Sequence, residues 1–449
     1  MMRLKSFILT LLLAGVSLQA NCQENYTWKA GWSRVRITPE ENIWQGGYAM
    51  RTSPSEGVFQ DIWAKALALE DASGKKAVLV TMDLLAIPLD FSEEVRESIR
   101  KKFGLEKDQI ILSVSHTHSA PVIGNSLYYI YPMDKENRRI VQKYTEGLKK
   151  DLVNLVGEAI SKSEPVLMFS GNGMTRFAVN RRRNGWPDSY TIPVGPSDYA
   201  VPVLKIEGLD NRVKIVLFGY ACHPVVNAGY QISGDWPGVA QYELEGLYPD
   251  AMCMFFQGCG ADQNPIAGGG APLSYMVQYG KQIAAAVEQV ISEPMTPVES
   301  KLETKYKEID LPFDKPISRE EMKAIAAVGS WESRWAEGML AKMDKGEKFP
   351  ATYPYPLEYW SLGSQKLFAL GGEVTCEYAI GLKEKYGKDI FVMGYANDVM
   401  SYIPSETIWN EGGYEGYDAP RVYALHARWT SDVEKRIMDA IDYLLNSKQ

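Results

Sequence analysis

The chain has 449 residues, 45% of them hydrophobic, so it is long enough to bury a sizeable core as one large domain or two ordinary ones. The 48 basic and 56 acidic residues give a formal net charge of -8. This balance argues against a nucleic-acid partner, because binding to phosphates needs clustered lysine and arginine.

The N-terminus has the pattern of a signal peptide. Arg3 and Lys5 precede a short apolar run, Phe7–Leu18, which is too short to span a bilayer. Cleavage is expected after Ala20, or before Cys22 if that cysteine is lipidated. We therefore expect an exported protein that is periplasmic, anchored to the outer membrane or secreted.

The N-terminal half of the chain alternates apolar runs with amphipathic helical patterns. In chain order, it predicts a strand at Ala77–Met82, a helix that begins at a capping box of Asp90 with Glu93 and ends at Gly104, a strand at Ile110–Val114, a helix over Ile140–Ala159, and strands at Val213–Phe218 and Met252–Phe256.

The C-terminal half continues the same alternation. It predicts a helix over Leu273–Ile291, an added antiparallel strand within Val298–Leu311, a helix capped by Ser318 with Glu321, a surface loop at Phe349–Trp360, strands at Leu367–Leu370 and Ile390–Met393, and a helical pattern at Arg421–Arg428.

Strands that alternate with helices indicate an α/β fold, with a mixed, mainly parallel sheet and helices on both of its faces. Ligands in such folds bind at the carboxyl ends of the strands. We therefore expect a metal site at the strand ends.

Three of the four histidines follow directly on predicted strands. His116 and His118 come after the strand Ile110–Val114, where extended backbone directs both side chains to the same side. His223 follows the strand Val213–Phe218. These histidines either cap strand ends through hydrogen bonds or converge on one ion, and the second interpretation is favoured because neutral imidazole is the commonest zinc ligand. His426 is interpreted as a surface or packing residue.

The histidines alone do not identify the remaining metal ligands. A catalytic zinc usually takes three protein ligands and a water, often with a carboxylate among the ligands. Four carboxylates at strand ends are candidates, and composition and spacing do not rank them: Asp83, Asp235, Asp262 and Glu373. Aspartates are also typical of turns and helix caps, so the three aspartates have this alternative interpretation.

One local basic cluster stands out, Asn180-Arg181-Arg182-Arg183. Arg181 either orients an anionic or hydroxyl-bearing group of a substrate or belongs to a solvated loop. The glycines around Gly258 lack the lysine and spacing of a phosphate-binding loop.

These motifs taken together resemble the neutral/alkaline, non-lysosomal ceramidase family. The resemblance is carried, in order, by Gly31-Trp32-Ser33-Arg34-Val35-Arg36-Ile37-Thr38-Pro39, Gly46-Gly47-Tyr48, His116-Thr117-His118-Ser119, Ala221-Cys222-His223-Pro224, Ser233-Gly234-Asp235, Gly260-Ala261-Asp262, Gly372-Glu373-Val374-Thr375, Ala396-Asn397-Asp398 and Tyr414-Glu415-Gly416.

The resemblance implies one zinc ion per chain and a specific set of residues. By motif position the ligands correspond to His116, His223, Glu373 and Tyr402. His118 corresponds to a substrate-binding or proton-transfer residue, Tyr414 to an oxyanion-side tyrosine, and Arg181 loosely to an active-site arginine. The twelve positions from Tyr402 to Tyr414 agree with the family spacing.

Two departures from the family pattern are present. Asn264 stands where the family has a serine in its Gly-Asp-Val-Ser-Pro motif, and the chain ends soon after Tyr414, without the C-terminal β-sandwich domain of full ceramidases. We therefore interpret the chain as a short form, with residues 1–22 as the signal peptide and residues 24–449 as a single ceramidase-like catalytic domain.

The function implied is that of an exported zinc-dependent amidohydrolase, which cleaves the N-acyl amide of ceramide or a related substrate by attack of a metal-activated water. The partners implied are a small-molecule N-acyl or lipid substrate and, peripherally, a membrane, with no obligate protein partner and no nucleic acid. Two alternatives stay open: a metal-dependent esterase or phosphoesterase, and a non-catalytic exported protein that binds lipid or glycan.

Overall fold

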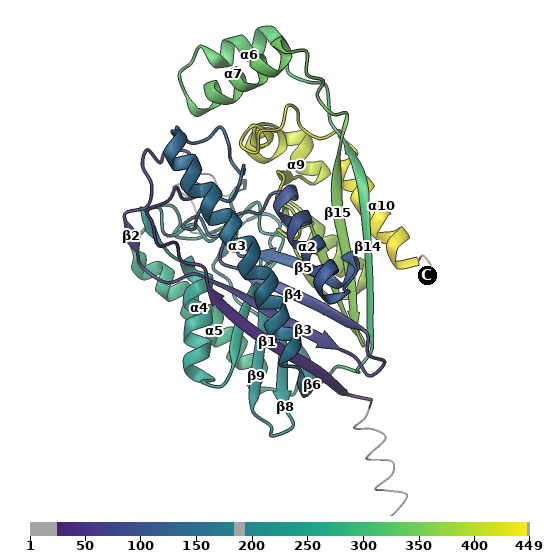
Figure 1. The fold of residues 1–449 in the computed structure, drawn as a ribbon. Coiled ribbons are helices and arrows are strands. Elements are labelled where there is room, and N and C mark those ends of the chain that lie inside the picture. The colour runs from purple at the N-terminus through teal and green to yellow at the C-terminus, as the bar shows by residue number, and fades with distance from the viewer. Residues whose placement is uncertain (1–24, 184–193, 447–449) are drawn as a thin grey trace, which may run out of the picture.

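The computed structural model describes residues 25–183 and 194–446 (Figure 1). The predicted signal peptide and Cys22 lie outside these residues. Within them, no helix combines the length and the apolar character needed to cross a membrane.

Nine of the described strands form one large mixed sheet, in the order β11-β9-β8-β6-β1-β3-β4-β5 with β13 beside β6. Their bounds are β1 (Thr27–Arg36), β3 (Trp63–Glu70), β4 (Lys76–Met82), β5 (Ile110–Val114), β6 (Glu164–Met174), β8 (Ala200–Gly208), β9 (Val213–Tyr220), β11 (Met252–Gln257) and β13 (Thr296–Pro297). The pairs β4–β5 and β9–β11, at the two edges, are parallel. The other pairs are antiparallel, so the predicted mixed sheet is confirmed but its mainly parallel character is wrong. Short connections such as that between β3 and β4 join only antiparallel neighbours.

A second sheet is built by the C-terminal part of the chain. It contains β14 (Leu302–Pro312), β15 (Thr352–Leu362), β16 (Gln365–Leu370) and β18 (Phe391–Met393), in that order. The antiparallel strand predicted within Val298–Leu311 is confirmed as β14. The surface loop predicted at Phe349–Trp360 is wrong, because most of this segment is the largely buried strand β15.

The prolines of β15 explain that error. Pro354 and Pro356 pair with β14, but β16 begins its pairing only at Leu357. Both prolines therefore lie where the strand has a neighbour on one side only, a position in which the missing N–H of proline is tolerated.

The two sheets pack face to face between two layers of helices (Figure 1). The helices α2 (Leu89–Phe103), α3 (Lys135–Ser161), α4 (Asp235–Leu247) and α5 (Leu273–Ser292) cover one face of the large sheet, and α8 (Cys376–Tyr386) and α10 (Val433–Asn446) cover the outer face of the second sheet. Alternate strand residues show the division: Ala66 and Val80 pack towards α2 and α3, whereas Leu67 and Leu79 pack against Trp360 and Leu367 of the second sheet. The prediction of helices on both faces of one sheet is therefore wrong, and the order of layers is α/β/β/α.

Some helix boundaries agree with the capping and termination signals in the sequence, and others do not. The helix α2 begins at Leu89 after Pro88, so Asp90 lies in its first turn rather than in a capping box, but Gly104 ends it with φ of 70°. The capping box of Ser318 is confirmed at the start of α6 (Arg319–Ala326). Together with α7 (Trp331–Asp344), α6 forms a hairpin that projects at the top of Figure 1.

The predicted helical pattern at Arg421–Arg428 is wrong. The 3₁₀ turn η3 (Ala419–Arg421) ends at Arg421, the first residue of the predicted segment, and irregular backbone follows. The ring of His426 contacts Phe313 and Phe349, with ring centroids 4.4 and 4.8 Å away, so His426 is a packing residue as expected.

Short elements complete the described chain: the 3₁₀ turn η1 (Lys107–Gln109), the paired strands β2 (Gly57–Val58) with β10 (Gln231–Ile232), β7 (Ala178–Asn180) with β12 (Gln263–Pro265) and β17 (Glu373–Val374) with β19 (Tyr402–Ile403), the helix α9 (Glu406–Glu411) and the π-helix η2 (Tyr414–Asp418).

Candidate metal centre

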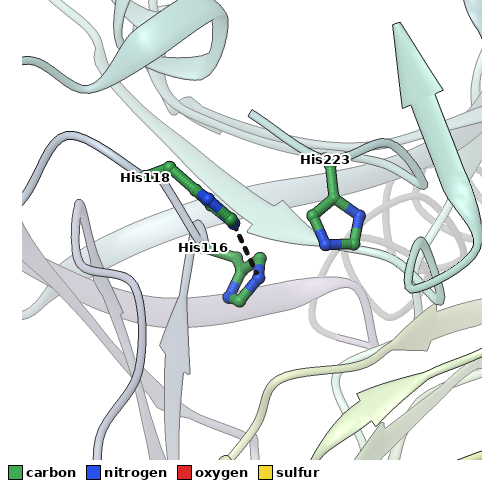
Figure 2. A group of neighbouring side chains, drawn as sticks. All are labelled: His116, His118 and His223. Atoms are coloured by element: carbon green, nitrogen blue, oxygen red, sulfur yellow. Dashed lines mark hydrogen bonds between the residues drawn. The ribbon is translucent and has the colours of Figure 1, made fainter. Parts of the chain in front are cut away.

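The three histidines predicted at strand ends converge in the structure (Figure 2). His116 lies just beyond β5 with φ of 63°, and its N–H donates to the carbonyl of Leu84 at 2.9 Å. His118 Nε2 lies 3.3 Å from His116 Nε2, and His223 comes from the end of β9. One ring nitrogen from each histidine lies within 4.8 Å of the others. The prediction that these side chains meet is confirmed.

Backbone carbonyls fix the orientation of two of the rings. His116 Nδ1 lies 2.8 Å from the carbonyl of Leu85, and His223 Nδ1 lies 2.7 Å from the carbonyl of Gly260. A carbonyl only accepts, so each Nδ1 carries the proton and donates it, and each Nε2 presents a lone pair to the centre. Metal-binding histidines are typically oriented in this way.

Glu373 and Tyr402 complete the group from the second half of the chain. They are directly opposite residues of the parallel strands β17 and β19. Glu373 Oε2 lies 3.1 Å from His116 Nε2 and 3.2 Å from His223 Nε2, and Tyr402 Oη lies 3.4 Å from His223 Nε2. Bonds of 2.0–2.1 Å in a tetrahedral site separate ligand atoms by about 3.3 Å, so these spacings fit a single small cation.

The charges at this point also favour a cation. Burial lowers the pKa of His223 to about 4, so its ring is neutral near pH 7. Glu373 is buried, and its Oε2 lies 3.1 and 3.2 Å from the Nε2 atoms of His116 and His223. A buried carboxylate therefore faces imidazole lone pairs, an arrangement that a bound cation stabilises and that would otherwise be costly.

Arg181 lies beside Tyr402 rather than in a solvated loop. Its Nη2 donates to Tyr402 Oη at 3.1 Å, and its Nε donates to Glu415 Oε1 at 2.7 Å. Arg182 Nη1 donates to the other oxygen of Glu415 at 2.6 Å. Arg181 Nη1 donates to Asn264 Oδ1 at 3.4 Å, so all three of its guanidinium nitrogens have protein partners, and its contact with the centre runs through Tyr402.

Tyr414 also adjoins the centre, at the first residue of η2. Its ring centroid lies 5.2 Å from that of Tyr402, and the residue is 42% exposed. π-helical turns often occur at functional sites. Tyr414 therefore stands between the buried donors and solvent.

Glu373 differs from the other three candidate carboxylates, which accept hydrogen bonds from N–H groups elsewhere in the fold and do not contact the histidines in this way. Asp83 accepts from Trp63 N and Gln241 Nε2, Asp235 from Asn227 N and Trp236 N, and Asp262 from Cys376 N and Asn180 Nδ2.

Three further residues shape the centre and were not identified from the sequence. A Cβ on Gly47, where φ is 106°, would lie 2.3 Å from His118 Nδ1, so only glycine lets that ring lie there. The ring centroid of Tyr395, which has φ of 54°, lies 4.5 Å from that of His116. The Tyr423 hydroxyl donates to Glu373. Gly47 and Tyr395 lie in or beside recognised motifs, whereas Tyr423 follows the last of them.

The sequence of residues 28–257 matches the family model described as neutral/alkaline non-lysosomal ceramidase, N-terminal. The chain belongs to this family. The matched residues include the three histidines and end before Glu373 and Tyr402, which the fold brings against them.

Curated neutral ceramidases match shorter segments. The Drosophila pseudoobscura pseudoobscura protein is 29% identical over 113 residues, and the Drosophila melanogaster protein is 30% identical over 98 residues. These segments are 24% and 21% of this chain, and only 16% and 14% of the length of the two relatives.

Solved ceramidase structures share the fold over most of the chain. The neutral ceramidase from Pseudomonas aeruginosa superposes with a TM-score of 0.71 at 17% identity, over 93% of this chain and 74% of that chain. A ceramidase complexed with C2 gives a TM-score of 0.71 at 16% identity, over 93% and 75%. The α/β class and the ceramidase fold expected from the sequence are thereby confirmed.

Proposed function

We propose that this chain is an exported zinc-dependent amidohydrolase that cleaves the N-acyl amide bond of ceramide or a related N-acylated substrate. The observation that carries the proposal is the position of Glu373 Oε2, 3.1 and 3.2 Å from the Nε2 atoms of His116 and His223. Membership of the ceramidase family supports the reaction class. The names of the relatives support the lipid substrate and, with it, peripheral contact with a membrane.

The proposed zinc ligands, for one ion per chain, are His116, His223, Glu373 and Tyr402. Imidazole, carboxylate and phenol oxygen suit zinc, and the carbonyls of Leu85 and Gly260 supply the outer hydrogen bonds that such ligands need. When bound, zinc lowers the pKa of a water molecule and polarises a carbonyl group.

His118 is the proposed proton carrier. Burial, followed by the neighbouring His116 and His223, lowers its pKa well below the ordinary value, so the ring is a neutral base near pH 7. Its Nδ1 has no hydrogen-bond partner among the described residues. A neutral imidazole at this position can take a proton from the attacking water and deliver it to the leaving amine.

Tyr414 and Arg181 are proposed to stabilise negative charge on nearby oxygen atoms. The phenol of Tyr414 can donate to the oxyanion that forms when the amide carbonyl is attacked. Arg181, 3.1 Å from Tyr402 Oη, favours a negatively charged phenol oxygen there and so strengthens it as a ligand.

The test combines metal analysis with an assay for released amine. The mature protein, His116→Ala and a matched control, His426→Ala, are reconstituted with zinc and supplied with ceramide, simple N-acyl amides, esters and phosphoesters. We expect one zinc per chain and amine release in the wild type and the control, and neither in His116→Ala.

Each other outcome points elsewhere. Turnover of esters or phosphoesters without amine release would favour the esterase or phosphoesterase alternative. Substrate binding without turnover in zinc-loaded protein would favour a lipid- or glycan-binding protein. A wild type that holds no zinc after reconstitution would overturn the metal site itself.

A further inference from the structure

Tyr423 contacts the side of Glu373 that faces away from the histidines. Its hydroxyl donates to Glu373 Oε1, while Glu373 Oε2 lies 3.1 Å from His116 Nε2 and 3.2 Å from His223 Nε2. The two oxygens of the same carboxylate therefore have separate partners.

This division has a chemical consequence. An ionised carboxylate only accepts hydrogen bonds, so the phenol of Tyr423 is the donor of the pair. With Oε1 engaged, the carboxylate cannot rotate freely about its terminal torsion, which is otherwise broad. Glu373 then offers one oxygen, in a fixed direction, to the point where the two imidazole nitrogens meet.

The position of Tyr423 is itself fixed by its surroundings. Its ring packs against Tyr402 and against the buried Ala261 and Ala419. The carbonyl of Pro420 accepts from Tyr423 N at 3.2 Å. Packing contacts and a backbone hydrogen bond thus hold Tyr423 in place.

The helix α7 secures the chain on either side of Tyr423. Arg421 Nη1 donates to Glu332 of α7 at 3.0 Å, and Trp335 Nε1, also in α7, donates to the carbonyl of Leu425 at 2.9 Å. The projecting α6–α7 hairpin is therefore connected to the segment that supports Glu373.

We propose that Tyr423 is a positioning residue, which holds Glu373 so that it binds the metal through Oε2 alone. The inference rests on the proposed zinc site and adds an outer partner to it. Removing such a partner typically weakens metal binding 10- to 100-fold, and we expect a loss of about that size.

The test uses Tyr423→Phe, which removes only the hydroxyl group. The matched control is Tyr144→Phe, because the Tyr144 hydroxyl also donates a hydrogen bond, to the carbonyl of Ile37 at 2.6 Å, away from the centre. Zinc affinity is measured by competition with a chelator, the coordination number by the visible spectrum of the cobalt(II)-loaded protein, and folding by the thermal midpoint of the metal-free protein.

We expect weaker zinc binding and an altered cobalt spectrum in Tyr423→Phe, with neither change in Tyr144→Phe. Wild-type affinity and an unchanged spectrum in Tyr423→Phe would overturn the inference and leave the zinc site standing. Equal losses in both variants, together with a lower thermal midpoint, would also overturn it. A wild type that binds no zinc would overturn the proposed function, and this inference with it.

Discussion

The substitution Glu373→Gln tests the centre most directly, because it keeps the shape of the side chain and removes its charge. In the metal-free protein the buried carboxylate faces the lone pairs of His116 and His223 at 3.1 and 3.2 Å. A glutamine N–H can instead donate to one of these nitrogens. We therefore expect the metal-free variant to be at least as stable as the metal-free wild type, although it binds zinc much more weakly.

The size of the effect follows from the number of ligands. Protein zinc sites with four ligands bind with about 10–16 kcal/mol, or about 3 kcal/mol for each ligand. Loss of the carboxylate should raise the Kd by about two orders of magnitude. At a zinc concentration of about 1,000 times the wild-type Kd, zinc should add about 4 kcal/mol to the free energy of unfolding of the wild type and about 1.4 kcal/mol to that of the variant.

Denaturant unfolding with and without zinc measures both free energies. Asp83→Asn is the control, since Asp83 is also a buried carboxylate but bonds to Trp63 and Gln241 instead of the histidines. Zinc should stabilise the control as it stabilises the wild type. Equal stabilisation of Glu373→Gln by zinc would refute the assignment of Glu373 as a ligand.

Three further predictions concern the histidines. His118→Ala should retain its zinc and lose most turnover, measured by metal analysis and amine release; loss of zinc would make His118 a ligand. Gly47→Ala should act in the same way, because its Cβ would lie 2.3 Å from His118 Nδ1, whereas Gly57→Ala, which meets nothing within 4 Å, should leave turnover unchanged. In metal-free protein, the NMR signals of His223 should titrate near pH 4, because burial lowers its pKa; protonation of His223 should then release zinc only below about pH 4, and a titration near the ordinary value of about 6.5 would contradict the buried position.

Much of the centre could be predicted because its signals are local. The strand β5 runs from Ile110 to Val114, as its apolar run predicts, and the histidine motif follows immediately. The convergence of His116 and His223 does not follow from that pattern, because β5 and β9 lie near opposite edges of the large sheet and antiparallel strands separate them. The choice of Glu373 over the aspartates came from the family resemblance, and the structure supplies its physical reason in the distances to the two imidazoles.

Other features depend on contacts that no local pattern encodes. The direction of strand pairing in the large sheet, and its packing against a second sheet, depend on which segments meet in space. The prolines at 354 and 356 argued against a strand, yet they are accommodated where β15 pairs on one side only. Tyr423 supports Glu373 from 50 positions away, in irregular backbone, where neither periodicity nor a motif marks it.

The wide separation of the proposed metal ligands along the chain has a consequence for how the protein acquires metal. His223 follows β9 of the large sheet, whereas Glu373 and Tyr402, 150 and 179 positions further along, lie in the short strand pair β17–β19. A nascent or proteolysed chain that ends before β17 offers only imidazoles, without the carboxylate that completes the set. On the proposed ligand assignment, zinc can be held firmly only after β17 and β19 have packed against the histidines, so the supply of zinc that matters is that of the compartment in which folding finishes.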